Sequence, residues 1–187
     1  MKKEKIRKIC WSNKANFKLS GAVNRHNCVY YSTENPHVTI EEQLNQPGVT
    51  VWAGLSCKGV IGPIFFNTTV TNGLYLNMLR DTIIPQLWLL YDNEDFYLQQ
   101  DGAPPHYAVT VCEFLDKELP HRWIGQRGPV EWPPRSPHLT PMDFFWGVIK
   151  DKVFSRKPRT VDDMSQCIRE ACQETDNNKK NSVPKCA

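Results

Sequence analysis

The 187-residue chain is long enough for one domain with a buried core, since domains cluster near about 100–150 residues. Hydrophobic residues make up 40% and charged residues 23%, and no apolar run reaches the roughly 18–20 residues of a membrane span, which excludes a membrane protein. The net charge of +3 and the pI of about 8.4 are too mild to identify a dedicated nucleic-acid-binding domain by charge alone.

The basic N-terminal end, residues 1–8, is followed by no apolar stretch, so no secretory signal is visible. This end is interpreted as either a weak nuclear signal or a solvated terminus. The number of cysteines is odd and no Cys-x-x-Cys pair occurs, which predicts reduced intracellular core residues and no zinc site. They are Cys10, Cys28, Cys57, Cys112, Cys167, Cys172 and Cys186.

The first third of the chain, residues 9–66, has the composition of strands and turns. A first strand is expected through Cys10 and Trp11 to Asn13, and residues 25–31 form a weaker candidate. Residues 49–55 and 60–66 are rich in β-formers and flank a Cys-Lys-Gly turn, which predicts a hairpin.

From Asn72 the apolar period becomes helical, with Asn72 as the expected cap and Pro85 expected to end or kink the helix near Ile84. Three further elements are predicted in chain order: a strand over 96–101, a helix from about His106 to Leu119, and a strand over 122–124.

Residues 125–142 are predicted to form a loop, because they hold many glycines and prolines. One helix is predicted from about Pro141, and a last helix from a capping-box-like word at Thr160. The polar tail, residues 175–187, is predicted to be disordered. Strands followed by alternating strands and helices indicate an α/β fold, a mixed sheet with helices packed on its faces.

Two acids have a context that suits chemistry: Asp101 ends a predicted strand, and Asp143 begins a predicted helix. Carboxylates brought together by folding bind Mg²⁺, and two such ions can clamp the attacking and leaving oxygens of a phosphodiester. The alternatives are structural. An Asp before Gly forms turns, and an Asp in the first turn of a helix complements the helix dipole.

The words around these acids resemble the motifs of mariner-type transposases. Residues 99–107 are similar to the second-acid motif, and residues 132–145 to the third-acid motif. Upstream, residues 19–27 and 32–37 are similar to the segment that follows the first acid. The resemblance extends over about residues 9–172.

The resemblance implies an RNase H-like mixed β-sheet flanked by helices, over residues 9–174. It also implies three acids that hold two Mg²⁺ or Mn²⁺ ions for DNA cleavage and strand transfer. The second acid corresponds to Asp101 and the third to Asp143. The first lies in a Ser-Asp-Glu word that here reads Ser12-Asn13-Lys14, so the first metal ligand is a degenerate Asn13.

This departure predicts impaired catalysis, because a carboxylate becomes neutral and the neighbouring acid becomes a lysine. Two unit charges about 4 Å apart interact by about 4 kcal/mol at an effective dielectric of ~20, and losing one such interaction costs roughly 10³-fold in rate. His138 also replaces an acid usual in the family, although that acid is not one of the three metal ligands.

A second departure lies in the predicted helix after Pro141. The usual Phe-Phe-Leu-Trp-Gly run appears as residues 144–147 without its leucine. A one-residue deletion in a helix rotates every later residue by about 100°, which would misplace the core face. The three aromatic residues of this run, Phe144, Phe145 and Trp146, are expected to pack in the core.

DNA is the expected partner. Arg135 and Lys150 are candidate contacts to its backbone, with Lys152 and Lys157 extending the basic stretch, although charge runs are usually solvated faces. His106 either contacts a phosphate or caps the following helix. A homodimer is possible, the expected compartment is the nucleus, and neither a membrane nor a small-molecule substrate is expected.

Three functions remain open from the sequence. The first is a metal-dependent DNA endonuclease and strand transferase. The second is a domesticated DNA-binding or dimerising domain without catalysis, and the third is a functionless relic. The resemblance begins at the catalytic region, so the DNA-binding region that precedes it in the family is expected to be absent. Asn13 disfavours the first function and leaves the enzymatic status uncertain.

Overall fold

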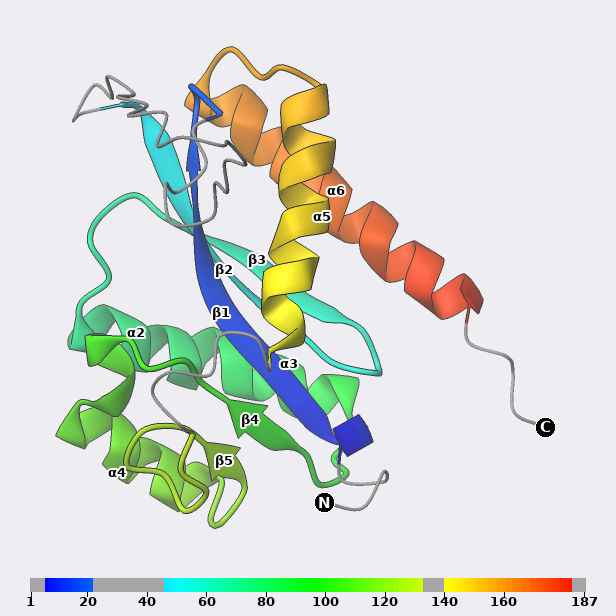
Figure 1. Ribbon diagram of the computed structural model, residues 1–187. Coiled ribbons are helices and arrows are strands. Elements are labelled where there is room, and N and C mark those ends of the chain that lie inside the picture. Colours follow the sequence, from blue (N-terminus) through cyan, green and yellow to red (C-terminus); the bar gives the residue numbers. More distant parts are fainter. Residues whose placement is uncertain (1–5, 22–45, 133–139, 183–187) are drawn as a thin grey trace, which may run out of the picture.

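A mixed five-stranded sheet organises the molecule in the computed structural model, which describes residues 6–21, 46–132 and 140–182 (Figure 1). The strand order is β3-β2-β1-β4-β5. Strands β1 (Ile9–Lys18), β2 (Gly48–Leu55) and β3 (Val60–Phe66) are antiparallel, whereas β4 (Tyr97–Gln99) and β5 (Trp123–Ile124) run parallel to β1. The predicted α/β fold with a mixed sheet is confirmed. The weak strand candidate over 25–31 lies outside the described residues.

The hairpin of β2 and β3 closes on a tight turn, as the sequence predicted. The Ser56 backbone N–H donates to the Gly59 carbonyl at 2.9 Å, and the Gly59 N–H donates to the Ser56 hydroxyl at 3.2 Å. Gly59 has a φ of +157°, which a residue without Cβ adopts at no steric cost.

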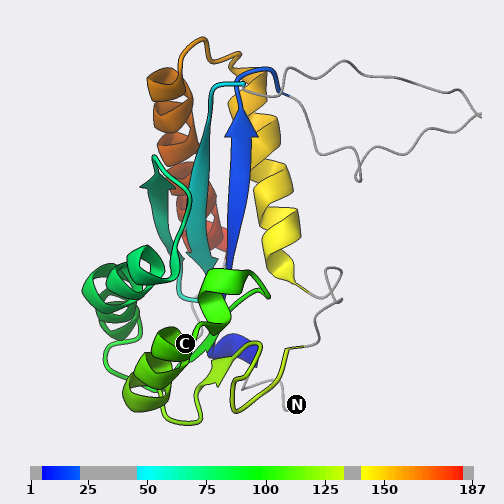
Figure 2. The ribbon, with the colours of Figure 1, turned by 90° about the vertical axis from the view of Figure 1, so that its left-hand side faces the viewer.

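The helices between Asn72 and Glu118 cover one face of the sheet (Figures 1 and 2). In chain order they are α2 (Asn72–Met78), a π-helical segment η2 (Leu79–Ile83), α3 (Ile84–Leu90), a 3-10 turn η3 (Pro104–Tyr107) and α4 (Val109–Glu118). Thr71, one residue before the predicted Asn72, caps α2 by accepting the Leu74 N–H at 3.3 Å.

Pro85 was expected to end or kink the helix near Ile84; the helix continues beyond it as α3, so the expected end is wrong. Pro85 lies in the first turn of α3, directly after the wider π-helical segment. A proline removes one helical N–H and crowds the preceding turn, and a π-helical segment accommodates both effects without ending the helix.

Helices α5 (Pro141–Ser155) and α6 (Val161–Ser182) cover the opposite face (Figures 1 and 2). The predicted start of α5 is confirmed, since the Thr140 hydroxyl accepts the Met142 N–H at 3.2 Å. Thr160 likewise accepts the Asp163 N–H at 3.1 Å at the start of α6. The Asp163 carboxylate accepts a hydrogen bond from the Arg159 N–H at 3.0 Å. In an ordinary capping box the donor is the N–H of the N-cap itself, here Thr160, so this bond lies one residue earlier.

The buried residues of α5 keep helical spacing on both sides of the point where the family has an additional leucine. Its buried residues follow one helical stripe: Met142, Phe145, Trp146, Ile149 and Val153. The expectation of a misplaced core face is therefore wrong. Phe144 was expected in the core but is 80% exposed, because it lies off this stripe.

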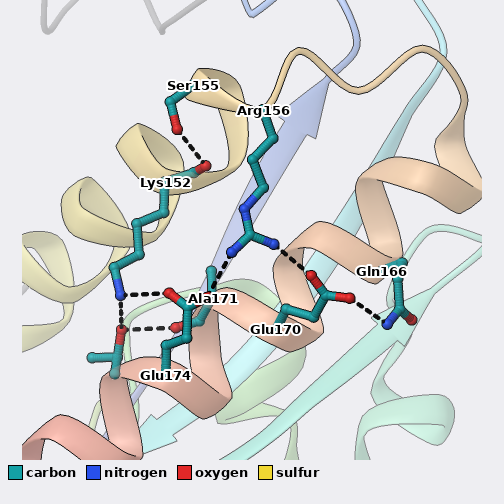
Figure 3. Close-up of polar contacts among 8 residues, drawn as sticks. Lys152, Ser155, Arg156, Gln166, Glu170, Ala171 and Glu174 are labelled. Atoms are coloured by element: carbon teal, nitrogen blue, oxygen red, sulfur yellow. Dashed lines mark hydrogen bonds and ion pairs between the residues drawn. The ribbon is translucent and has the colours of Figure 1, made fainter.

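An ion-pair network ties the end of α5 to α6 (Figure 3). Arg156 bridges Glu170 at 2.5 Å and Glu174 at 2.7 Å, and the Lys152 ammonium lies 3.1 Å from Glu174. Lys152, expected to extend a basic DNA-facing stretch, thus has its charge balanced within the domain.

The last helix extends past the expected domain boundary at residue 174. The Asp176 carboxylate accepts the Val60 N–H at 3.0 Å, which ties this part of α6 to the β2–β3 hairpin. Helix α6 continues to Ser182, so the prediction of a disordered tail from residue 175 is wrong at its start. Within the described residues, no helix is both long and apolar enough to cross a membrane.

Candidate active site

The three positions matched to the family's acids lie on elements that adjoin one another (Figures 1 and 2). In the parallel pairing of β1 and β4, Trp11 is opposite Gln99, and beyond this pair the charge of Lys14 acts on Asp101. Helix α5 packs on β1, with Met142 in the same core cluster as Ala15 of β1. The three positions thus lie within β1, just after β4 and in the first turn of α5, and that their side chains meet at one site stays a prediction.

Asn13 lies in the middle of β1, opposite Ala53 of β2. Its half-buried side chain bends back on its own strand, and its Oδ1 accepts the N–H of Lys14 at 2.6 Å. Side chains alternate along a strand, so Asn13 shares a face with Ala15 and Phe17, which pack against α5. Lys14 points to the other face of the sheet.

Asp101 follows β4 and is held by the turn after it. Its Oδ1 accepts the Ala103 N–H at 3.0 Å and lies 2.5 Å from the His106 Nδ1. Burial acts to raise the pKa of the Asp101 carboxyl, but His106, the Ala103 N–H and the Lys14 ammonium together hold that pKa below its ordinary value.

His106 is a core residue, only 2% exposed. Its ring stacks on Tyr75 of α2, with 4.1 Å between centroids and 22° between planes. The expected phosphate contact does not fit this burial, because a backbone phosphate stays in solvent. The expected cap is wrong as well, since Ala108 is the N-cap of α4 and no side chain bonds there.

Tyr75 and Gln100 complete the surroundings of Asp101, and neither was expected from the sequence. The Tyr75 hydroxyl donates to Gln100 Oε1 at 2.6 Å. Burial, followed by the charge of Asp101, raises the Tyr75 pKa well above its ordinary value. The tyrosine lies outside the matched motifs, and its helical spacing indicates only core packing, so the sequence carried no signal for this role.

Asp143 lies in the first turn of α5 and is exposed. Farther along α5, the Lys150 ammonium lies 5.8 Å from the centroid of the Phe17 ring, and burial lowers the pKa of Lys150. Lys150 is half-buried, so less of it is available to DNA than a freely solvated lysine would offer. Arg135 lies outside the described residues.

Comparison with known proteins shows what the chain is similar to. Over 181 residues the chain is 24% identical to the Transposable element Tc3 transposase of Caenorhabditis elegans, an alignment that covers 94% of this chain and 52% of that protein. No family profile matches the chain.

Two solved structures illustrate the likeness in fold. The Mos1 transposase paired-end complex with the left transposon end superposes with a TM-score of 0.55 at 17% identity, covering 92% of this chain and 54% of that one. The Mos1 transposase catalytic domain with Raltegravir and Mg gives 0.53 at 12% identity, covering 97% and 88%. The chain has the RNase H-like fold seen in the Mos1 transposase catalytic domain. It spans about half the length of the Tc3 relative, 52%.

The side chains described at the three matched positions do not fit a site for two divalent ions. Relatives in the Mos1 group have been solved with Mg and with Mn. Among the residues described for this chain, no group of three or more His, Cys, Asp or Glu side chains could hold a metal ion. Two carboxylates and one amide remain at the matched positions, and both Asn13 Oδ1 and Asp101 Oδ1 already accept backbone N–H groups.

Proposed function

We propose that this chain is a transposase catalytic domain of the metal-dependent DNA cleavage and strand-transfer class whose cleavage activity is impaired. One observation carries the proposal. The side chain at the first acid position is an amide bonded to its own backbone, and the next residue is a lysine whose charge acts on Asp101. The alternative is a non-catalytic DNA-binding or dimerising domain with the same fold.

Electrostatics explains the impairment. Two divalent ions a few ångströms apart repel each other, and clustered carboxylates must offset that repulsion. Each lost charge pair at about 4 Å is worth about 4 kcal/mol at an effective dielectric of ~20, which corresponds to roughly 10³-fold in rate. Lys14 adds a positive charge where the family has a negative one, so ion affinity falls further.

The test restores the family's Asp and Glu at positions 13 and 14. Asn13→Asp with Lys14→Glu is compared with Asn16→Asp with Lys18→Glu, which makes the same charge change farther along β1. We expect calorimetry to show at least about tenfold tighter Mn²⁺ binding for the first pair only, by the same Coulomb argument. Nicking of supercoiled plasmid measures cutting, and the unmodified chain is expected to show none.

Two results would contradict the proposal. Robust nicking by the unmodified chain, abolished by Asp101→Ala, would mean that Asn13 is a tolerated ligand. Equal metal affinity for both paired variants would mean that position 13 does not face the site, and the match to the family's first acid would have to be abandoned.

DNA is the proposed partner, supported by the fold and by the DNA complexes of Mos1 named above. With a net charge of only +3, binding should be weak, sequence-independent and steeply weakened by salt as counterions are released. A mobility-shift series that shows one preferred sequence at physiological salt would contradict this. The proposed compartment is the nucleus, which imaging of a fluorescent fusion tests, and light scattering tests for a homodimer.

A further inference from the structure

The Asp101 carboxylate is bound by the protein itself. One of its oxygens, Oδ1, accepts the Ala103 N–H at 3.0 Å and lies 2.5 Å from His106 Nδ1. The His106 side chain is 1% exposed, whereas that of Asp101 is 29% exposed. The pair therefore spans from the accessible edge of the sheet into the core.

We infer that Asp101 is a structural anchor: its pairing with buried His106 fastens the η3 turn to the end of β4, and these protein groups occupy the oxygen that a cation would otherwise bind. This role goes beyond the proposed function, because it holds whether or not the domain cuts DNA. In this role Asp101 stabilises the folded protein in the absence of metal. A carboxylate that serves only as a metal ligand does not do so until its ion binds.

The Asp101–His106 pair belongs to a chain of side-chain contacts that begins at Asp101 and ends at its sequence neighbour Gln100. Asp101 holds His106, the imidazole stacks on Tyr75, and the Tyr75 hydroxyl donates to Gln100, the residue before Asp101. Three elements, β4, η3 and α2, are thereby connected through side chains that are almost all buried. Buried polar networks of this kind lose more than one contact when a member is removed.

His106 depends on Asp101 for its polar contacts. Both ring nitrogens of His106 are buried, and neither makes a hydrogen bond of good geometry within the residues that the structure describes, so the close contact of Nδ1 with Asp101 Oδ1 at 2.5 Å is the polar contact that this ring has there. Removing the carboxylate leaves the imidazole in the core without a polar partner, and an unsatisfied buried polar group is costly. Lys14 supplies a further favourable charge, as its effect on Asp101 indicates.

Replacing a carboxylate changes the stability of the metal-free protein in opposite directions for a structural anchor and for a metal ligand without its ion. Carboxylates that cluster for an absent cation repel one another, so replacing one of them stabilises the metal-free protein. An anchoring carboxylate has the opposite sign, because its loss breaks bonds that already exist. Asp101 and Asp143 occupy equivalent positions in the family, so they provide a matched pair for this comparison.

The experiment is thermal unfolding of the full chain and of the variants Asp101→Ala, Asp101→Asn and Asp143→Ala, each in EDTA and in excess Mg²⁺. We expect Asp101→Ala to lower Tm by on the order of 5 °C equally in both conditions. Asp101→Asn, which keeps an acceptor at Oδ1, should lower Tm by less, as should Asp143→Ala, because Asp143 is exposed in the first turn of α5. A higher or unchanged Tm for Asp101→Ala in EDTA overturns the inference, as does Mg²⁺ stabilisation of the unmodified chain that this variant abolishes.

A second measurement covers the case in which Asp101→Ala does not fold. Proton NMR of the unmodified chain should show a protected, downfield imidazole N–H resonance from His106, unchanged by Mg²⁺. Its absence, or its loss on adding Mg²⁺, overturns the anchor. Both readouts are independent of plasmid nicking, so failure of this inference and failure of the proposed function are distinguishable.

Discussion

Inserting one leucine between Phe145 and Trp146 restores the family's aromatic word, and we expect it to destabilise this protein severely. The insertion turns every later residue of α5 by about 100° about the helix axis. Trp146, Ile149 and Val153 are 4%, 0% and 0% exposed, and all three would leave the core. Trp146 would also lose its edge contact with Phe17, whose ring centroid is 5.9 Å away.

The loss in free energy of unfolding follows from the burial of these three side chains. Removing one large core side chain costs about 2–5 kcal/mol, so displacing three exceeds much or all of a typical stability of about 5–15 kcal/mol. We therefore expect either an unfolded chain or a helix that absorbs the residue as a π-bulge with a much lower Tm. Circular dichroism during heating measures both outcomes.

The control for this insertion is a leucine placed between Pro158 and Arg159, in the connection between α5 and α6, where no helix is rotated. It should melt close to the unmodified chain. Equal melting temperatures for the two insertions would refute the reasoning, because they would mean that the stripe of α5 does not fix its register on the sheet.

Three other predictions concern stability. Tyr75→Phe, which removes the bond to Gln100, should cost about 1–2 kcal/mol in urea unfolding, and an unchanged midpoint would show that the bond contributes nothing. Arg156→Gln should lower Tm slightly and make it less sensitive to salt, and identical salt curves would argue against the α5–α6 ion pairs. Burial raises the pKa of Cys172 to about 12 from an ordinary 9.0, so the unfolded chain releases this proton first and stability should fall as pH rises from 9 towards 12. Cys172→Ala should flatten that decline, and an unchanged alkaline slope would contradict the assignment.

The elements whose signals are local were predictable from the sequence. The start of α5 is set by Thr140 before Pro141, since a hydroxyl cap and a proline in the first turn act within a few residues. The hairpin around Gly59 is set by a turn between two β-rich runs. The match to the family's motifs also predicted that Asp101 and Asn13 converge, which stays a prediction, although β1 and β4 do pair side by side.

The errors all concern what distant segments pack against. His106 is polar and close to an acid, and only the position of Tyr75, some thirty residues earlier, makes it a core residue. Phe144 is as apolar as Phe145, yet the helix stripe buries one and exposes the other. The path through Pro85 depends on a π-helical segment, which local propensity does not indicate. These outcomes are set by tertiary packing, which the residues taken one at a time do not specify.

The position of β1 at the centre of the sheet has a consequence for synthesis on the ribosome. β1 is made first, but its parallel partner β4 is made about eighty residues later, and the helices that cover its α5 face come later still. Until α5 and α6 emerge, the β1–β2–β3 meander exposes Phe17, Val49 and Val51 to solvent as an apolar surface. Such non-local pairing is slow and aggregation-prone, so nascent chains stalled before residue 141 should depend on chaperones for solubility.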